Sequence, residues 1–364
     1  VQMTRRRRSR SQRLAKENRG PHAGTSKHHG WRRTAEDEQV LDFAGRFGAL
    51  TLRHAADHFY NGVFATGKER AQFMSEAGLL ERNDNLRWAG TLVYPTAWGL
   101  AAVKAPGRPE LRALVPGEER MLHRLLVAEA ALRLQGKGIT VASERQMRAV
   151  ERAEDRGEAS RNFASASGVH LFAEDNPGQP VVRPSFDGVD RPRFWGIPVG
   201  TDEKLHWPDF VAVVGGRMIA VEVELELKER WRMNATLRAY KRSIEAGHIA
   251  QVLWHVTPDV QMQLEGRRGP DGWEDGLLQE IGYLDSGVAP DWTVKGRPMV
   301  VRPVEATDEG VVYALSQRIL IPSMRSSYRQ WKQWRKTYDD TQTPLGFEDW
   351  LMRPGTIQKL KMLA

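Results

Sequence analysis

The sequence predicts an α/β protein in which a small helical unit with a two-stranded hairpin precedes a mixed sheet with flanking helices. Two observations carry this prediction. Between residues 35 and 104, segments with apolar residues at helical spacing are followed by two short strand-like runs. Between residues 207 and 256, two strand-like runs flank a Gly-Gly pair, and a helical segment and a further strand follow. We therefore expect two structured parts, joined by a Pro- and Gly-rich linker at 105–117.

The composition is that of a globular protein. Of the 364 residues, 40% are hydrophobic and 27% are charged. No apolar run reaches the length of about 18 residues that a membrane-spanning helix needs, so we expect no membrane partner. The absence of cysteine excludes disulfides, cysteine-ligated metal clusters and thiol catalysis. The first residues carry arginines without an apolar segment behind them, so we expect no secretory signal and a cytoplasmic location.

The net charge of +8 belongs to the first 34 residues. This segment has eleven basic residues and one acid, for a charge of +10, whereas the rest of the chain carries −2. Residues 1–34 are nearly free of aliphatic side chains, so we expect a disordered tail. Its densest basic run is Arg5, Arg6, Arg7 and Arg8. Such a tail neutralises phosphates and gives salt-sensitive affinity for nucleic acid without sequence preference; the alternative is a tail that serves solubility.

The unit at 35–104 has a recognisable element order. Helices are expected at 35–47, 51–59 and 66–77, strands at 79–82 and 91–95, and a last helix at 96–103. This order resembles the winged helix-turn-helix domains of bacterial DNA-binding proteins, which place the third helix in the major groove. The resemblance implies double-stranded DNA as the partner. The implied contacts are Lys68, Arg70 and Gln72 on the helix and Arg82 and Arg87 on the wing. The alternative is a winged helix that mediates protein contacts.

The second part is expected at 118–260. It begins with a helix at 118–134 and a short strand at 139–142. Residues 144–203 are charged and rich in Gly and Pro, and such a length is unusual for a loop inside a compact domain. We therefore expect a partly ordered insertion there.

The C-terminal part, 261–364, is expected to be an extension. Residues 298–305 and 311–321 are predicted to pair as a hairpin that either extends the sheet or builds a small subdomain. Residues 325–338 mix bases and aromatics and predict a basic aromatic helix. This helix either buries its aromatic side, as its spacing suggests, or stacks on nucleic acid.

The strongest local signal is the hairpin at 207–228. The pair at 215–216 is Gly-Gly, which is typical of a two-residue hairpin turn. A two-residue turn fixes the register, so Val214 faces Arg217 and every other facing pair follows from this one. A helix at about 229–246 and a strand at 249–256 are expected to follow.

This register brings three acids together. Asp209 lies opposite Glu222, and Glu224 lies on the same face one pleat further on. Directly opposed carboxylates destabilise a sheet. A hard cation such as Mg²⁺ or Mn²⁺, which prefers carboxylate oxygens and water, would compensate them. We therefore predict a metal site at Asp209, Glu222 and Glu224; the alternative is an ordinary polar face of a sheet.

The order helix, strand, hairpin, helix and strand, with a Pro-Asp step at Asp209 and Glu222 thirteen residues later, resembles the PD-(D/E)xK nuclease fold. The resemblance implies metal-dependent hydrolysis of a phosphodiester bond, by nicking or cutting. The lysine of that pattern is expected two residues after the glutamate, where this chain has Glu224. The nearest lysine in a Glu-x-Lys is Lys228, after Glu226, and we assign it as the cation for the phosphate. The alternative is a base of the following helix, which offers Arg232, Arg238 and Lys241. The predicted catalytic residues are Asp209, Glu222, Glu224 and Lys228.

Residues 36–258 as a whole resemble the replication-relaxation family of bacterial plasmids and mobile elements. The shared features are the winged helix, the helix with His123-Arg-Leu-Leu-Val, and the acidic hairpin followed by a helix that contains Tyr240. The resemblance implies a role in replication or transfer of mobile DNA. The function stays open between a metal-dependent endonuclease or nickase, a non-catalytic regulator or replication accessory factor on a degenerate nuclease fold, and a protein-interaction scaffold. A homodimer is among the expected states.

Overall fold

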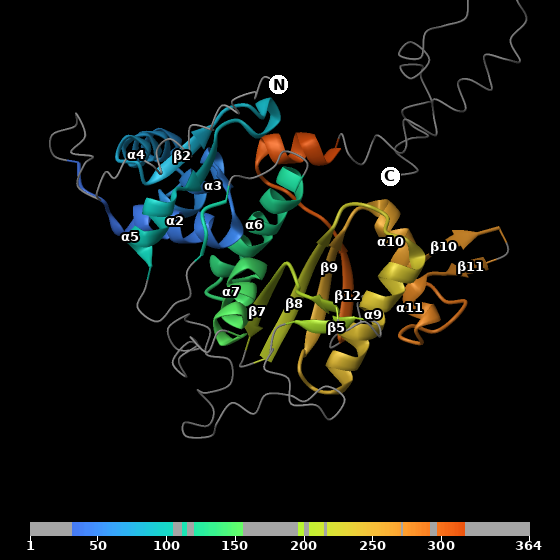
Figure 1. The fold of residues 1–364 in the computed structure, drawn as a ribbon. Helices are drawn as coiled ribbons and strands as arrows, with labels where there is room; N and C mark the ends of the chain where they lie inside the picture. The colour runs from blue at the N-terminus through green and yellow to red at the C-terminus, as the bar shows by residue number, and fades with distance from the viewer. Residues whose placement is uncertain are drawn as a thin grey trace, which may run out of the picture.

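The computed structural model describes residues 31–104, 111–114, 120–155, 196–199, 204–214, 217–270, 272–291 and 297–316. These residues form a mixed α/β protein with a five-stranded mixed sheet and flanking helices (Figure 1). The α/β class and the mixed sheet predicted from the sequence are thereby confirmed. Among the described residues, no helix has both the length and the apolar character needed to cross a bilayer.

The N-terminal unit contains the expected helices and strands. Its elements are α2 (Ala35–Phe47), β1 (Leu50–Thr51), α3 (Leu52–Phe59), α4 (Phe64–Glu76), β2 (Leu80–Asn83), the 3-10 helix η1 (Arg87–Ala89), β3 (Leu92–Pro95) and α5 (Ala97–Val103). The three strands pair antiparallel in the order β1-β3-β2. Strand β1 was not predicted, because two residues are too few to show an alternating pattern.

Helix α2 shows how local signals set the boundaries of these elements. Thr34 Oγ1 accepts from the Asp37 amide at 3.4 Å, and Asp37 Oδ2 accepts from the Thr34 amide at 2.9 Å, which is a capping box. Gly48 ends the helix with φ 98°, a left-handed conformation that glycine adopts without strain. The buried ring of Phe47 meets Phe210 of the sheet, with ring centroids 6.1 Å apart. The N-terminal unit and the sheet therefore share one hydrophobic core.

The central sheet has the strand order β12-β9-β8-β7-β4. Its strands are β4 (Thr140–Ser143), β7 (Phe210–Val214), β8 (Arg217–Glu224), β9 (Gln251–Val256) and β12 (Met299–Pro303). Strand β7 is antiparallel to both β4 and β8, whereas β9 is parallel to β8 and to β12. In the β7–β8 hairpin the facing pairs run from Val214 and Arg217 to Phe210 and Val221. This confirms the register predicted from the Gly-Gly turn.

Side chains alternate between two cores on the two faces of the sheet. Phe210 and Val221 pack in the core that contains α6 (Met121–Gln135) and the N-terminal unit. Val211 and Ala220 point the other way, toward α9 (Arg230–Glu245), α10 (Pro258–Glu265) and α11 (Leu277–Glu280). Two short hairpins flank the sheet: β5 (Ile197–Val199) with β6 (Lys204–His206), and β10 (Gly266–Gly269) with β11 (Gly272–Asp275).

The start of the predicted insertion at 144–203 is a helix. Helix α7 (Glu144–Asp155) follows β4 directly and lies beside α2 at the edge of the sheet (Figure 1). The Ser143 amide donates to Gln146 Oε1 at 3.1 Å, and the Gln146 amide donates to Ser143 Oγ at 3.3 Å. This is a capping box of the Ser-x-x-Gln type. The sequence signal was present, and the charged composition of the segment masked it.

The predicted hairpin of 298–305 with 311–321 is wrong. Strand β12 pairs parallel with β9, and residues 309–316 form a helix. Asp308 caps that helix, because its Oδ1 accepts from the amides of Gly310 and Val311 at 2.9 and 3.2 Å. Because β12 belongs to the central sheet, the sheet extends past residue 260, where we expected the C-terminal extension to begin.

Several predicted features lie outside the described residues. They are the basic tail up to residue 30, the segment 156–195, the Gly-Gly turn at 215–216, and the basic aromatic helix at 325–338. Their predictions stay as stated.

Candidate functional site

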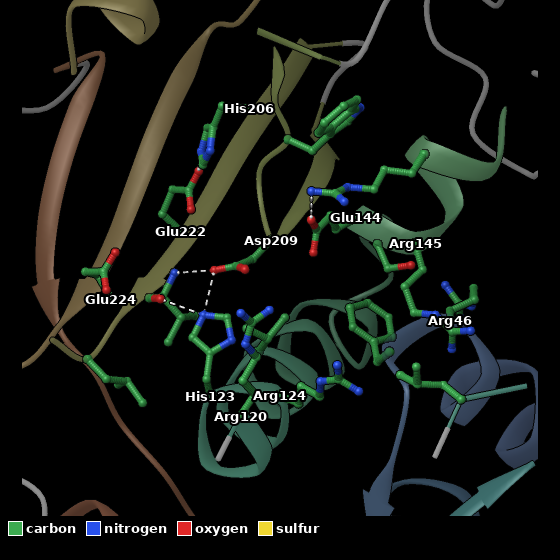
Figure 2. Close-up of a pocket in the computed structure, with 18 of the residues that line it drawn as sticks. Arg46, Arg120, His123, Arg124, Glu144, Arg145, His206, Asp209, Glu222 and Glu224 are labelled. Atoms are coloured by element: carbon green, nitrogen blue, oxygen red, sulfur yellow. Dashed lines mark hydrogen bonds and ion pairs between the residues drawn. The ribbon is translucent and has the colours of Figure 1, made fainter. Parts of the chain in front are cut away.

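A cavity of about 1390 Å³ lies between the end of β8, the loop that precedes β7, and the helices α2, α6 and α7. Its lining includes the four residues that the sequence assigned to catalysis: Asp209, Glu222, Glu224 and Lys228. Figure 2 shows the three acids on the sheet side of the cavity, with basic side chains from the helices facing them. The fold thus gathers the predicted site residues around one pocket.

Arginines form the wall opposite the carboxylates. Arg120, His123 and Arg124 lie three and four residues apart at the start of α6, so they leave the same face of that helix, toward the cavity. The other arginines of the described lining are Arg46, Arg112, Arg145, Arg148 and Arg232. A concave wall of one charge concentrates counter-ions, in this case anions.

The arginines of this wall differ in their protein partners. Arg148 binds Glu144 at 2.6 Å and lies over the Trp207 ring, 4.4 Å from its centroid. Arg124 Nη1, in contrast, is buried and has no hydrogen-bond partner among the described residues. Burial and the neighbouring Arg120 both lower the pKa of the Arg124 guanidinium. An anion in the cavity would satisfy the unpaired donor and relieve the repulsion between the two arginines.

Asp209 lies directly before β7 and faces α6. Its Oδ2 accepts from the Val223 amide at 2.8 Å and lies 3.2 Å from His123 Nε2. The same His123 nitrogen lies 2.8 Å from the Val223 carbonyl oxygen. Burial alone would raise the pKa of Asp209, but the charge and the hydrogen bond of His123 outweigh it and lower that pKa. Asp209 is therefore an ionised carboxylate with a fixed orientation.

Glu222, on β8, is held by residues of different elements. Its Oε1 lies 2.6 Å from His206 Nε2 and accepts from the hydroxyl of Tyr240 on α9. Burial lowers the pKa of His206, but the Glu222 charge outweighs it, and the net shift is upward. Burial and the same carboxylate raise the pKa of Tyr240 well above its ordinary value, so its hydroxyl stays protonated and donates.

Glu224 ends β8 and forms an ion pair with Lys228. Burial raises the pKa of the Glu224 carboxyl, and the Lys228 charge offsets this in part. The strand register alone would leave Lys228 three pleats beyond Glu222, the residue that faces Asp209. However, β8 ends at Glu224, and the chain that follows brings the ammonium group back to the pocket. Lys228 therefore lies beside Glu224, the acid that stands at the position of the lysine in the nuclease pattern.

Protein cations compensate all three acids of the site. The pairs are Asp209 with His123, Glu222 with His206, and Glu224 with Lys228. Among the described residues, no three His, Asp or Glu side chains are gathered as a metal-binding group. The protein itself thus supplies part of the positive charge that the opposed carboxylates require. Asp209 and Glu222 also turn toward different partners.

Sequence reasoning did not assign a role to His123 and missed His206. His206 ends β6 and reaches Glu222 across the sheet, a proximity that no spacing in the sequence reveals. For His123 a signal existed, because it shares one helix face with Arg120 and Arg124. A polar stripe on an otherwise apolar helix indicates a face that meets a site or solvent.

The titration of His123 gives a direct check of this geometry. Burial lowers its pKa, but Asp209 outweighs burial and raises it from 6.5 to about 9. The stabilisation by this pair is therefore fully present below about pH 6.5 and is lost as the pH rises through about 9. We expect the His123 ring resonances in NMR spectra to titrate near pH 9 in the wild type and well below that in Asp209→Asn. A wild-type midpoint below 7 would contradict the pairing.

The predicted DNA contacts of α4 divide into exposed and internally bound side chains. Lys68 and Gln72 are exposed. Arg70 instead donates to Asp37 of α2, with Nε to Oδ1 at 3.1 Å, and its guanidinium lies over the ring of Trp31. Arg70 therefore fixes α4 against α2, and we leave it out of the set of proposed DNA contacts.

The remaining predicted contacts are less defined. Arg82, on β2, is half-buried. Arg87 lies in η1, and its side chain is not among those described. The tail arginines Arg5, Arg6, Arg7 and Arg8 lie outside the described residues.

Comparisons with protein-family models, with curated proteins and with solved structures return no match for this chain. The functional argument therefore rests on the pocket and its side chains.

Proposed function

We propose that the protein binds DNA and hydrolyses a phosphodiester bond in this pocket with Mg²⁺ or Mn²⁺. One observation carries the proposal: Asp209 and Glu222 line the same cavity as an arginine wall that includes Arg124, whose buried Nη1 has no hydrogen-bond partner among the described residues. Carboxylates bind hard divalent cations, and arginines bind phosphates. A site with both is suited to a phosphodiester, because its cleavage develops further negative charge on the phosphate.

The residues of the chain have separate tasks in this proposal. Arg120 and Arg124 bind oxygens of the DNA backbone and orient the phosphate toward the sheet. Glu224 accepts the proton of the attacking water, a task suited to a carboxylate whose pKa burial has raised. Lys228, paired with Glu224, stabilises the charge that develops on the phosphate.

Asp209 and Glu222 fit a divalent cation by their chemistry. Mg²⁺ is commonly held by one or two carboxylates together with waters and substrate phosphates, so a cage of three protein ligands is not required. When bound, the cation would act as a Lewis acid on the scissile phosphate. His123 and His206 hold the two carboxylates in position and satisfy them while no cation competes.

The N-terminal unit and the tail supply affinity for duplex DNA in this proposal. Three helices followed by the β2–β3 hairpin match the order of a winged helix, and α4 exposes Lys68 and Gln72. The basic tail adds affinity that is independent of sequence. From the resemblance of residues 36–258 to the replication-relaxation family, we further propose that the reaction serves replication or transfer of a mobile element.

The test of this function is the conversion of supercoiled plasmid by the purified full chain. We expect relaxed or linear product in Mg²⁺ or Mn²⁺ and none in EDTA. Absence of product in both metals, under conditions where the DNA is retarded on a gel, would contradict hydrolysis.

Substitution of Arg124 should weaken DNA binding without unfolding the protein. In Arg124→Gln, we expect the affinity for DNA to fall about ten- to a hundredfold, because one charge-assisted phosphate contact is worth about 1.5–3 kcal/mol. The matched control is Arg238→Gln, which removes an exposed arginine of α9 outside the cavity. Affinities are measured by fluorescence anisotropy in EDTA at fixed salt. Equal losses in the two variants would contradict a phosphate contact at Arg124.

A second function is favoured by a separate observation. Each of the three acids already has a basic partner, and Glu224 occupies the position of the lysine in the nuclease pattern. These features fit a non-catalytic DNA-binding regulator or replication accessory factor on a degenerate nuclease fold. Such a protein would leave plasmid uncut in both metals and would bind DNA equally well after Asp209→Asn.

A further inference from the structure

The acids of the pocket are recessed. The exposed fractions of the Asp209, Glu222 and Glu224 side chains are 15%, 7% and 12%. The cavity above them measures about 1390 Å³. Pockets for drug-sized ligands measure about 300–1,000 Å³, so this cavity has room for a few nucleotides of one strand and not for a length of duplex. The depth of these acids and the size of the cavity therefore favour a strand that has left its partner.

An exposed tryptophan stands beside the entrance of the cavity. Trp231, in the first turn of α9, is 70% exposed. Its Nε1 donates to Glu229 Oε2 at 2.7 Å, and both Glu229 and Arg232 line the cavity. Leu227, which also lines the cavity, is 59% exposed. Trp231 itself is not among the lining residues, but it lies between two of them in the chain, and its ring is open to solvent.

Exposed aromatic rings beside a basic groove are characteristic of proteins that bind single strands. Unpaired bases offer their faces for stacking, whereas the bases of a duplex are stacked on each other. The wall of Arg120 and Arg124 provides the matching contacts for the backbone of the same strand. Trp231 thus lies beside the same cavity whose lining contains the basic wall and the recessed acids.

We propose that the pocket takes single-stranded DNA, with one base stacked on Trp231 and the adjoining phosphates on the arginine wall. This inference rests on the proposed function of the same pocket and names its substrate class. The winged-helix unit binds duplex, so the preferred substrate is a duplex with an unpaired strand beside it.

The test measures binding in EDTA, so that no strand is cut. A labelled single strand of about 16 nucleotides, within the range covered by one single-strand binding module, is compared with the blunt duplex of the same sequence by fluorescence anisotropy. The full chain is used as wild type, Trp231→Ala, Trp231→Phe and Trp98→Ala. Trp98, on α5, is 46% exposed, and unlike Trp231 it has no chain neighbours in the described lining of the cavity, so it is the matched control.

We expect Trp231→Ala to bind the single strand about tenfold more weakly, because stacking on one aromatic ring is worth roughly that factor. Trp231→Phe should retain most of the affinity, Trp98→Ala should bind like the wild type, and duplex affinity should stay unchanged in all three variants. Equal single-strand affinity of wild type and Trp231→Ala, or an equal loss on duplex, would overturn the inference.

These outcomes are separable from those of the proposed hydrolysis. A loss of single-strand binding in Trp231→Ala, with no plasmid conversion in either metal, would keep the single-strand site and reject catalysis. Metal-dependent cleavage with no effect of Trp231 on single-strand binding would keep catalysis and reject the single-strand site.

Discussion

Asp209→Asn should abolish metal-dependent cleavage and leave DNA binding intact. We expect the rate of cleavage to fall about a thousandfold or more, because the substitution removes a charge that the reaction requires in the transition state. Asparagine keeps the size of the side chain and an oxygen that can accept from the Val223 amide, so the fold around β7 should persist. Cleavage is measured on a labelled strand in Mg²⁺, and binding on the same strand in EDTA.

The matched control is Asp285→Asn, which removes an exposed carboxylate outside the cavity. We expect this variant to cleave and bind like the wild type. If Asp209→Asn cuts DNA as fast as Asp285→Asn does, Asp209 has no part in the reaction and the pocket is not the site of hydrolysis.

The largest effect on stability is expected at Glu129, which is fully buried on α6. Its Oε1 accepts from the amide and, at 2.6 Å, the hydroxyl of Thr307, and its Oε2 lies 3.3 Å from His54 Nε2. Glu129→Ala would leave these buried groups without a partner. Breaking a buried pair in this way costs about 3–5 kcal/mol, so we expect the free energy of unfolding in urea to fall by about that amount.

The same contacts set the pH dependence of this effect. Burial raises the pKa of Glu129, but the hydrogen bonds from His54 and Thr307 outweigh it and lower that pKa. The stabilisation is therefore present above about pH 4.5 and is lost as the pH falls through the lowered value. Glu305→Ala, which removes an exposed carboxylate paired with Arg133, is the control and should cost at most about 1 kcal/mol. Equal losses in the two variants would contradict the buried network.

Much of the fold follows from local signals in the sequence. The Gly-Gly pair predicted the register of β7 and β8, because a two-residue turn leaves one way to align the strands. The end of α2 was predicted from Gly48, whereas the capping box at Thr34, which sets its start, was found in the structure. The acids of the pocket were found for the same reason, since a fixed register places residues across a hairpin as surely as along a strand.

Other parts depend on contacts between distant segments. Nothing in the spacing of His123 and His206 indicates that they neutralise Asp209 and Glu222, because they reach these acids from α6 and β6. The strand predicted from residue 311 is a helix over 309–316, because Asp308 caps it. Short apolar runs such as this one fit either structure, and the tertiary context decides between them.

The acids of the pocket are already paired with basic side chains. From the sequence we expected the opposed carboxylates to need a metal cation, but the protein supplies histidines and a lysine for that purpose. A divalent cation therefore has to compete with bases that are already in place. If the cation displaces these bases from the carboxylates, the pocket is a catalytic site. If it does not, the acids form a polar face whose charge the protein compensates by itself.

We propose that Asp209 and Glu222 hold a divalent cation beside a DNA phosphate. Mn²⁺ is titrated into the full chain with bound single-stranded DNA, and its binding is followed by the loss of the free Mn²⁺ signal in electron paramagnetic resonance. We expect the wild type to retain Mn²⁺ that Asp209→Asn and Glu222→Gln do not, while Asp285→Asn behaves like the wild type. Equal Mn²⁺ binding by the wild type and both pocket variants would contradict the metal site and favour the non-catalytic function.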